Sequence, residues 1–251
     1  MIDLKDKVSL ITGASRGIGR AAALLFAKAG SHVVVNYRSN ESAAREVCRK
    51  IESLGGTALS MQADVAVRAE VDRMVAAVME RFGRIDVLVN NAGIWERNDI
   101  ASLDDHRLRE TIETNLLGHY YPIAAVVPHM VKQHSGCIIN ISSTAGQRGE
   151  AFHSPYAATK GAIISLTKSL APELAEHNIR VNCVAPGWVD TDMSHEALIG
   201  PERKSILEKI PLGRAGTADE LAGPIVFLAS DLATFITGEI LNVNGGAVLC
   251  G

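Results

Sequence analysis

The sequence predicts an α/β fold in which helices cover both faces of a mostly parallel sheet, a doubly wound three-layer sandwich. Three observations predict it: short runs rich in Val and Ile recur along the chain, longer stretches of helical character separate them, and a glycine-rich turn directly follows the first run. Strands that are separated by helices pair in parallel, and open α/β sheets bind their ligands at the carboxyl ends of such strands.

The expected strands are almost continuously apolar, which is typical of strands buried on both faces. They occupy residues 8–11, 33–35, 87–89, 138–141, 181–184 and 240–243. The expected helices occupy residues 17–29, 42–54 and 71–82, a segment around 108–122, and residues 157–176. No linker rich in Pro, Ser or Gly divides the chain, so we expect one domain over residues 1–251. The least regular stretch, residues 188–211, is a candidate for a mobile flap over a site, although a plain surface excursion explains it equally well.

Composition excludes several classes of partner. Hydrophobic residues make up 47% of the chain and charged residues 21%, the balance of a globular protein with a sizeable core. The net charge of -3 gives no positive field for nucleic acid or an anionic membrane, so neither is an expected partner. The apolar runs are too short to span a bilayer and the N-terminus lacks a secretory signal, so a cytoplasmic location is expected. The spacing of Cys48, Cys137, Cys183 and Cys250 predicts free structural thiols and no metal site.

A turn with three glycines opens the first expected helix. Gly13 permits a tight turn, Gly17 lets the backbone approach a pyrophosphate, and Gly19 allows close packing of the helix. The helix N-terminus adds free N–H groups and a positive dipole, so an anion is favoured there. The spacing differs from the general GxGxxG fingerprint, and a glycine turn without function is the alternative.

The end of the second expected strand indicates which dinucleotide fits. Enzymes that use NAD commonly place an acid there to bind the ribose 2′-hydroxyl, whereas this chain has Asn36, Tyr37, Arg38 and Ser39. Arg38, together with Arg16 in the glycine turn, would attract a 2′-phosphate. The sequence therefore favours NADP(H) over NAD(H), the alternative being that both arginines are solvated surface charges.

Three residues form a candidate catalytic group. Tyr156 and Lys160 are four residues apart at the start of an expected helix, so their side chains project from one face. An ammonium beside a phenol typically lowers the pKa of the phenol by about 1–3 units, toward the range of proton exchange at neutral pH. Ser143 directly follows the strand end at 138–142, where its hydroxyl can hydrogen-bond a carbonyl oxygen as negative charge develops. Such a Tyr/Lys pair alone is usually ordinary helix surface, and the nearby strand end favours catalysis.

The chain resembles the short-chain dehydrogenase/reductase family over essentially its whole length. The motifs that carry the resemblance are the glycine turn at 12–19, Asn-Asn-Ala-Gly at 90–93, Ser143, Tyr-Ala-Ala-Thr-Lys at 156–160 and Pro-Gly at 186–187. The resemblance implies a Rossmann-type fold with a seven-stranded sheet. It also implies an oxidoreductase that moves hydride between NADP(H) and a carbonyl or alcohol carbon.

The resemblance further implies roles for single residues. Ser143 polarises the carbonyl, Tyr156 is the acid/base, and Lys160 tunes Tyr156 and binds the nicotinamide ribose. Asn115 matches the fourth catalytic position of the family, which holds a water in a proton relay through Lys160. The implied cofactor-binding residues are Gly13, Ser15, Arg16, Gly17, Ile18, Gly19, Arg38, Asp64, Val65, Asn91, Ala92, Gly93, Tyr156, Lys160, Pro186, Gly187, Val189 and Thr191. Of these, Asp64 and Val65 would meet the adenine, and Val189 and Thr191 the carboxamide end.

Within the family, the chain most resembles the β-ketoacyl-carrier-protein reductases, which implies a small carbonyl or acyl thioester substrate. Such reductases present arginines to the acidic carrier protein at two positions where this chain has His134 and His177, so docking of a carrier protein is doubtful. Nearby, Lys132 and Arg180 are alternative cationic contacts, although each is more simply explained as a solvated surface residue. Trp95 and Trp188 stand where the family builds its substrate pocket, with plain packing as the alternative.

Two alternative functions remain open, and the resemblance also implies an oligomeric state. A sugar or polyol dehydrogenase resembling glucose 1-dehydrogenase and a non-catalytic NADPH-binding sensor are the alternatives, and the complete catalytic set argues against the sensor. The resemblance also implies a homotetramer whose long helices pack across subunits. The apolar residues Ile163, Leu166, Leu170 and Leu174 have the helical spacing for this, although a core within the chain explains them equally well.

Overall fold

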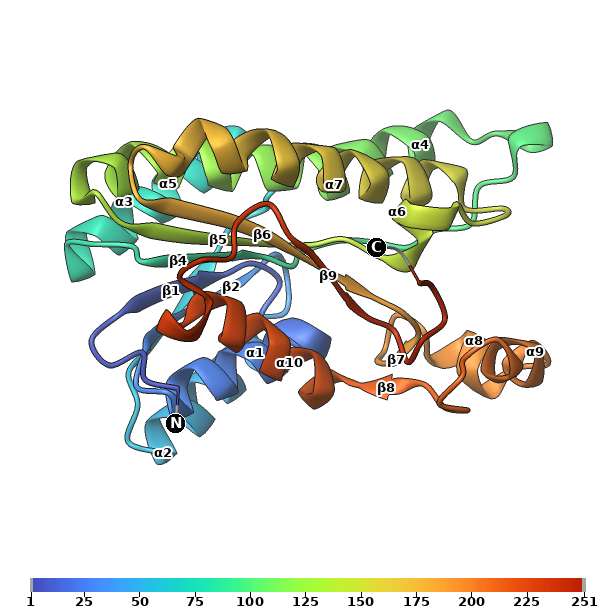
Figure 1. Ribbon diagram of the computed structural model, residues 1–251, viewed down its shortest axis with the longest axis horizontal. Coiled ribbons are helices and arrows are strands. Elements are labelled where there is room, and N and C mark those ends of the chain that lie inside the picture. Colours follow the sequence, from blue (N-terminus) through green and yellow to red (C-terminus); the bar gives the residue numbers. More distant parts are fainter. Residues whose placement is uncertain (1, 250–251) are drawn as a thin grey trace.

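A sheet of seven strands crosses the centre of the molecule, and helices cover it on both faces (Figure 1). The computed structural model describes residues 2–249. The strands of the sheet are β1 (Val8–Ile11), β2 (His32–Tyr37), β3 (Ala58–Gln62), β4 (Val87–Asn90), β5 (Gly136–Ile141), β6 (Ile179–Pro186) and β9 (Ile240–Val243). They follow the order β3-β2-β1-β4-β5-β6-β9. The predicted doubly wound α/β fold is confirmed.

Every neighbouring pair of strands in this sheet is parallel over the described residues, so the sheet is wholly and not just mostly parallel. Six of the strands occur where the sequence predicts them. The pattern does not predict β3, because the sequence of residues 58–62 contains no β-branched residue. This edge strand forms through its pairing with β2, in a register that sets Val33 opposite Ala58.

Two sets of helices bury the two faces of the sheet. Helices α1 (Gly17–Lys28), α2 (Glu41–Ser53) and α10 (Ala218–Ala229) cover one face, and α3 (Arg68–Phe82), α5 (Gly118–Gln133) and α7 (Ser154–Ala175) cover the other (Figure 1). In β2, Val33 and Val35 belong to the first core and Val34 to the second, because side chains alternate along a strand. Burying each such Val stabilises the fold by about 1.5–3 kcal/mol.

Two helical regions differ from the expectation. The predicted helix around 108–122 is instead α4 (Asp105–Ile112), a π-helical turn η2 (Glu113–Leu117) and the start of α5. Helix α10 is not predicted, although the sequence contains a signal for its start: the Thr217 hydroxyl accepts a hydrogen bond from the backbone N–H of Glu220, whose carboxylate in turn accepts one from the backbone N–H of Thr217. Two short 3-10 turns are η1 (Ile100–Ser102) and η3 (Asp231–Ala233).

The stretch at 188–211 contains regular structure that its irregular sequence does not predict. It forms β7 (Val189–Asp190), α8 (His195–Ile199) and α9 (Arg203–Glu208), and β7 pairs with β8 (Gly216–Thr217). Figure 1 shows these elements beside the sheet, next to its carboxyl ends. A small apolar cluster of Leu198, Ile206 and Ile210 holds them together and packs against Trp188. Whether the segment moves as a flap stays a prediction.

The apolar stripe of α7 faces the interior of the chain. Ile163, Leu166 and Leu174 are buried in the core between α7, α5 and the sheet, and Leu170 packs against that core. The stripe is therefore explained by packing within the chain. The homotetramer stays a prediction that this stripe does not support.

Candidate active site

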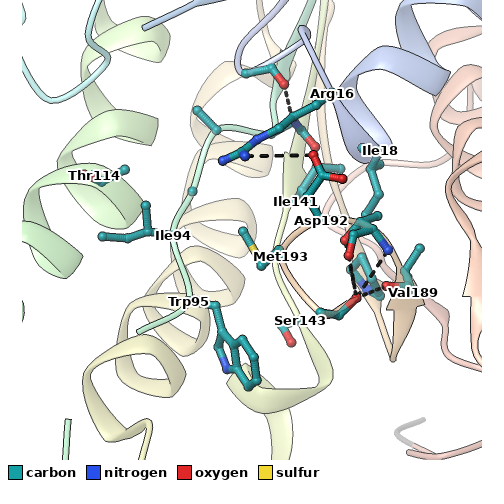
Figure 2. A pocket seen from close by; sticks show the side chains of 18 of the residues that line it. Arg16, Ile18, Ile94, Trp95, Thr114, Ile141, Ser143, Val189, Asp192 and Met193 are labelled. Carbon is teal, nitrogen blue, oxygen red and sulfur yellow. Dashed lines mark hydrogen bonds and ion pairs between the residues drawn. The ribbon is translucent and has the colours of Figure 1, made fainter. Parts of the chain in front are cut away.

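A cleft of about 450 Å³ opens at the carboxyl ends of the central strands. Its lining comes largely from the turns that follow β1, β2, β3, β4, β5 and β6, as expected for a parallel α/β sheet. Figure 2 shows Arg16 at one end of this cleft, Met193 near its middle, and Trp95 and Ser143 at the other end. The two ends differ in chemistry: the first is cationic and the second is aromatic with hydroxyl groups.

The backbone conformation and close packing of the glycine turn exclude side chains at its three glycines. Gly13 and Gly17 have φ of +62° and +54°, a conformation that side chains strongly disfavour. A Cβ at Gly13 would lie 3.0 Å from the Cα of Ala92, and one at Gly19 would lie 2.5 Å from the carbonyl oxygen of Gly13. Gly19 therefore packs behind the turn, whereas Gly13 and Gly17 line the cleft.

Two polar side chains that sequence reasoning missed fasten this turn to the neighbouring strand ends. The Thr12 hydroxyl accepts hydrogen bonds from the backbone N–H groups of Asn91 (2.9 Å) and Ala92 (3.1 Å). The Asn36 side chain accepts one from the N–H of Gly13 (3.2 Å) and donates one to the carbonyl of Ala63 (3.0 Å). Each residue directly follows an apolar run that predicts a strand, but their hydrogen-bond partners are distant in the chain, so the sequence gives no signal of this role.

The cationic end of the cleft is formed by Arg16 and Arg38. Both side chains line the cleft and are more than half exposed, at 72% and 55%. Arg16 lies 3.9 Å from a carboxylate oxygen of Asp192, an ion pair drawn in Figure 2, and Arg38 lies 4.0 Å from one of Glu110. Exposed pairs of this kind are worth little, about 0–1 kcal/mol, so both guanidinium groups remain available to an incoming anion.

The remaining predicted cofactor residues also line the cleft. They are Ser15, Ile18, Asp64, Val65, Asn91, Ala92, Gly93, Pro186, Gly187, Val189 and Thr191. On the far wall, the Ser194 hydroxyl donates to the carbonyl of Val189 and accepts from the backbone N–H of Thr191 (3.3 Å), so a serine that the sequence does not single out shapes this wall.

At the other end of the cleft, three predicted catalytic side chains converge from two helices. Ser143 caps α6 (Thr144–Arg148), where its hydroxyl accepts the N–H of Ala145 at 3.1 Å. Tyr156 and Lys160 lie in the first turns of α7, with Tyr156 in a side-chain hydrogen bond with Ser143. The Lys160 ammonium donates a 2.7 Å hydrogen bond to the carbonyl of Ile141. All three side chains line the cleft.

Burial dominates the acidity of this group. It raises the pKa of Tyr156 to about 12, against a lowering by the hydrogen bond to Ser143, and the charge of Glu150 raises it further. Burial lowers the pKa of Lys160 to about 8, partly offset by Cys183. The expectation that Lys160 lowers the pKa of Tyr156 is therefore wrong for the protein alone. Its ammonium is held by a carbonyl and lies 5.8 Å from the centre of the phenol ring.

Asn115 lies behind the cleft and not in it. It stands in the π-helical turn η2, fully buried, where its side chain accepts the N–H of Ile94 (2.8 Å) and donates to the carbonyl of Ile94 (2.9 Å). Gly93 separates it from the cleft, since a Cβ at Gly93 would lie 3.1 Å from Asn115 Oδ1 and 3.6 Å from Lys160 Nζ. The Asn115 amide and the Lys160 ammonium therefore both lie within 4 Å of the space beside Gly93 that a side chain would fill.

The aromatic end contains both tryptophans. Their rings meet edge to face, with centroids 5.7 Å apart, and His153 stacks on Trp95 at 4.5 Å. Trp95 also donates from its indole N–H to Glu150 (3.4 Å), a residue that sequence reasoning missed and whose pKa is raised mainly by burial. Both tryptophans line the cleft as well as packing, so the pocket interpretation is favoured over packing alone.

His134 and His177 lie far from this cleft. They come just before β5 and β6, at the amino ends of these strands, whereas the cleft is at the carboxyl ends. Arg180 donates to the carbonyl of Leu228 at 2.8 Å, so it is engaged within the fold and is a poor substitute contact for a carrier protein.

No group of three or more His, Cys, Asp or Glu side chains within residues 2–249 could hold a metal ion. Cys48, Cys137 and Cys183 are free and buried, and Cys250 lies outside the described residues. No helix in the described part is long and apolar enough to cross a bilayer.

Comparisons with known proteins agree with this geometry. A family model described as enoyl-(acyl carrier protein) reductase matches residues 13–248. A 3-oxoacyl-[acyl-carrier-protein] reductase of Staphylococcus epidermidis is 44% identical over 96% of this chain and 98% of its own length. A Synechocystis protein of the same name is also 44% identical, over 99% of this chain and all of its own length. A gluconate 5-dehydrogenase from Burkholderia cenocepacia, solved with NADP and tartrate, superposes with a TM-score of 0.93 at 36% identity, over 98% of this chain and 96% of its own.

Proposed function

This chain belongs to the short-chain dehydrogenase/reductase family, and on that premise we propose that it is an NADPH-dependent 3-oxoacyl-[acyl-carrier-protein] reductase or a similar carbonyl reductase. It reduces a ketone to a secondary alcohol. The observation that carries this proposal is the convergence of the Ser143 and Tyr156 hydroxyls with the Lys160 ammonium beside the glycine turn. Two hydroxyls suit an oxygen that gains negative charge, which favours a carbonyl over a carbon–carbon double bond as the group reduced.

The cleft fits NADPH. The close approach of Gly13 to Ala92 leaves a turn of bare backbone at the N-terminus of α1, where N–H groups suit a pyrophosphate. Arg16 and Arg38 would hold the 2′-phosphate, and the residues that follow β2 directly, Arg38 and Ser39, include no carboxylate to repel it. When bound, NADPH supplies hydride to the carbonyl carbon.

The side chains of this protein handle the proton. Ser143 donates a hydrogen bond to the carbonyl oxygen as negative charge develops, and Tyr156 gives that oxygen its proton. The Lys160 ammonium returns a proton to the phenolate, which its pKa of about 8 suits at neutral pH. Asn115, next to Lys160, supports the route by which Lys160 is reprotonated.

The substrate is a small carbonyl compound or an acyl thioester. Trp95, Trp188 and Met193 offer an apolar wall beside the hydroxyl groups, which suits an acyl chain. We propose that the thioester is presented without strong docking of a carrier protein at His134 and His177, and that the protein works in the cytoplasm as a homotetramer.

A sugar-acid or polyol dehydrogenase is the second candidate, favoured by the likeness to a gluconate 5-dehydrogenase. The partly buried Glu150 beside Trp95 opposes it, because a carboxylate there repels a sugar acid.

Oxidation of NADPH with an acetoacetyl thioester, a diketone and 5-ketogluconate, and reduction of NADP⁺ with gluconate and glucose, separate these candidates. We expect the thioester to have the highest kcat/KM. Turnover of the sugars with no reduction of the thioester would replace the proposed function by the second candidate, and NADPH binding without any turnover would leave the sensor.

A further inference from the structure

A buried histidine next to the active site has no part in the function proposed above. His119 lies in the first turn of α5, one helical turn beyond Asn115, and none of its surface is exposed. Neither of its ring nitrogens has a hydrogen-bond partner among the described residues. Buried polar groups are nearly always hydrogen-bonded, so a histidine in this place needs an explanation that an apolar residue would not need.

The polar and charged groups that act on the His119 ring lie in and around the catalytic group. The backbone carbonyls of Asn90, Asn115 and Ile141 lie beside it, but none is aligned for a hydrogen bond with a ring nitrogen. The charged group that acts on the ring is Lys160, from α7. Since Lys160 donates to the same Ile141 carbonyl at 2.7 Å, the imidazole and the ammonium share one neighbour.

The surroundings of His119 keep it neutral. Burial and then the positive charge of Lys160 lower its pKa to about 3. The titratable group that acts on His119 is Lys160 of α7, and β4, β5 and η2 contribute carbonyls. Tyr156 of α7 and Cys183 of β6 lie near Lys160. A neutral imidazole carries one N–H and one lone pair.

The lone pair of this imidazole needs a donor. Carbonyl oxygens only accept hydrogen bonds, so the three that surround the ring can satisfy its N–H but not its lone pair. A second acceptor nearby is also short of a donor: Asn90 Oδ1 has no partner, although Asn90 Nδ2 donates to Asn140 at 3.0 Å. Two neighbouring side chains have N–H groups to give: the Asn90 amide, which uses one of its two for Asn140, and the Lys160 ammonium, which has three and gives one to the Ile141 carbonyl. The ammonium is the stronger donor because it is charged.

We propose that His119 is a positioning residue for Lys160: its unprotonated ring nitrogen accepts a hydrogen bond from a water molecule that in turn accepts one from the Lys160 ammonium. This contact holds the ammonium between the Ile141 carbonyl and Tyr156 during the proton transfers of the reaction. The inference rests on the proposed carbonyl reduction. The O–H bond of Tyr156 breaks as an O–H bond forms on the product, and an N–H bond of Lys160 breaks to restore the phenol. Lys160 then regains its proton from solvent water, by the route that Asn115 supports. His119 gains and loses no proton over the cycle.

Two substitutions and one control test the proposal kinetically. His119→Phe keeps a planar ring and removes both nitrogens, whereas His119→Gln keeps a hydrogen-bond acceptor. His129→Gln, on the same helix and half-buried, is the matched control. We expect H119F to lower kcat about 10- to 100-fold, with KM and the Kd for NADPH changed by no more than about twofold, and to shift the basic limb of the kcat–pH profile. H119Q should recover most of the kcat, and H129Q should match the unaltered protein.

The proposal is overturned if H119F keeps the normal kcat and pH profile, or if H119Q is as slow as H119F. A fall in kcat that is matched by a fall in NADPH affinity or in the folded fraction indicates a structural role for His119 and also overturns the proposal.

A spectroscopic test on the histidine itself needs no substrate. It also covers the case in which H119F does not fold. The ¹⁵N chemical shift of the unprotonated His119 nitrogen reports whether it accepts a hydrogen bond, and we expect it to change in Lys160→Met. An unchanged shift contradicts the proposal. If the unaltered protein reduces no ketone, the proposed function fails, while this spectrum still decides the contact between His119 and Lys160.

Discussion

The Lys160 ammonium is hydrogen-bonded to the carbonyl of Ile141 at 2.7 Å and lies 5.8 Å from the centre of the Tyr156 ring. Both side chains are buried, and burial reverses the usual order of their pKa values. The pKa of Lys160 falls to about 8, whereas that of Tyr156 rises to about 12. In the protein alone, the lysine therefore loses its proton before the tyrosine does. The lysine is the group that titrates near neutral pH.

Replacing Tyr156 by Phe removes the proton donor and leaves the shape of the cleft almost unchanged. We expect kcat for ketone reduction to fall about 10²- to 10⁴-fold, the range for loss of general acid catalysis, while the Kd for NADPH stays within about threefold. Stopped-flow turnover and NADPH fluorescence titration measure the two quantities. Normal turnover in this variant would remove Tyr156 from the mechanism.

The pH dependence of reduction should follow Lys160. Its pKa in the folded protein is lowered from its ordinary value to about 8, so the ammonium is present below that pH and is lost above it. Because the ammonium returns the proton to Tyr156, we expect kcat to fall as pH rises through about 8. Measurement at saturating NADPH between about pH 6 and 9.5 checks this. A kcat that stays constant over this range contradicts the assignment.

Arg38→Asp replaces a cation at the predicted 2′-phosphate site by an acid. Loss of a charge-assisted hydrogen bond costs about 1.5–3 kcal/mol, so the ratio of kcat/KM for NADPH over NADH should fall at least about tenfold. The control is Arg45→Asp on α2, an exposed arginine paired with Glu41 that does not line the cleft. Equal ratios in the two variants would place Arg38 outside the cofactor site.

Gly19→Ala tests the packing of the glycine turn. The new Cβ would lie 2.5 Å from the Gly13 carbonyl oxygen, so we expect the free energy of unfolding to fall by about 1–3 kcal/mol and NADPH binding to weaken. Gly223→Ala, also in a helix, meets no atom within 4 Å and should change stability by less than about 1 kcal/mol. Urea denaturation of both variants decides the comparison. If the two substitutions cost the same, close packing is not the reason for Gly19.

The predicted strands and the observed ones differ in an instructive way. Runs of Val and Ile at β1, β2 and β5 predict strands because β-branched residues fit a sheet that is buried on both faces. No such run marks β3, which exists because β2 offers it a partner. The π-helical turn that carries Asn115 is equally invisible in the sequence, since its residues favour an ordinary helix.

The residues of the candidate active site also fall into those that the sequence predicts and those that only the structure shows. The four-residue spacing of Tyr156 and Lys160, the glycines of the turn and the arginines beside it are local patterns that the sequence displays. Thr12, Asn36 and Glu150 act through partners that are distant in the chain, so no local pattern distinguishes them.

The sequence by itself determined the class of fold, the location of the cleft at the strand ends and the identity of its hydroxyl and ammonium groups, because periodicity, glycine spacing and side-chain chemistry are local properties. Only the tertiary structure decided the direction in which the pKa values of Tyr156 and Lys160 move and the burial of His119 against them. Desolvation depends on everything packed around a group, and the elements that enclose these three side chains come from segments scattered between residues 87 and 186.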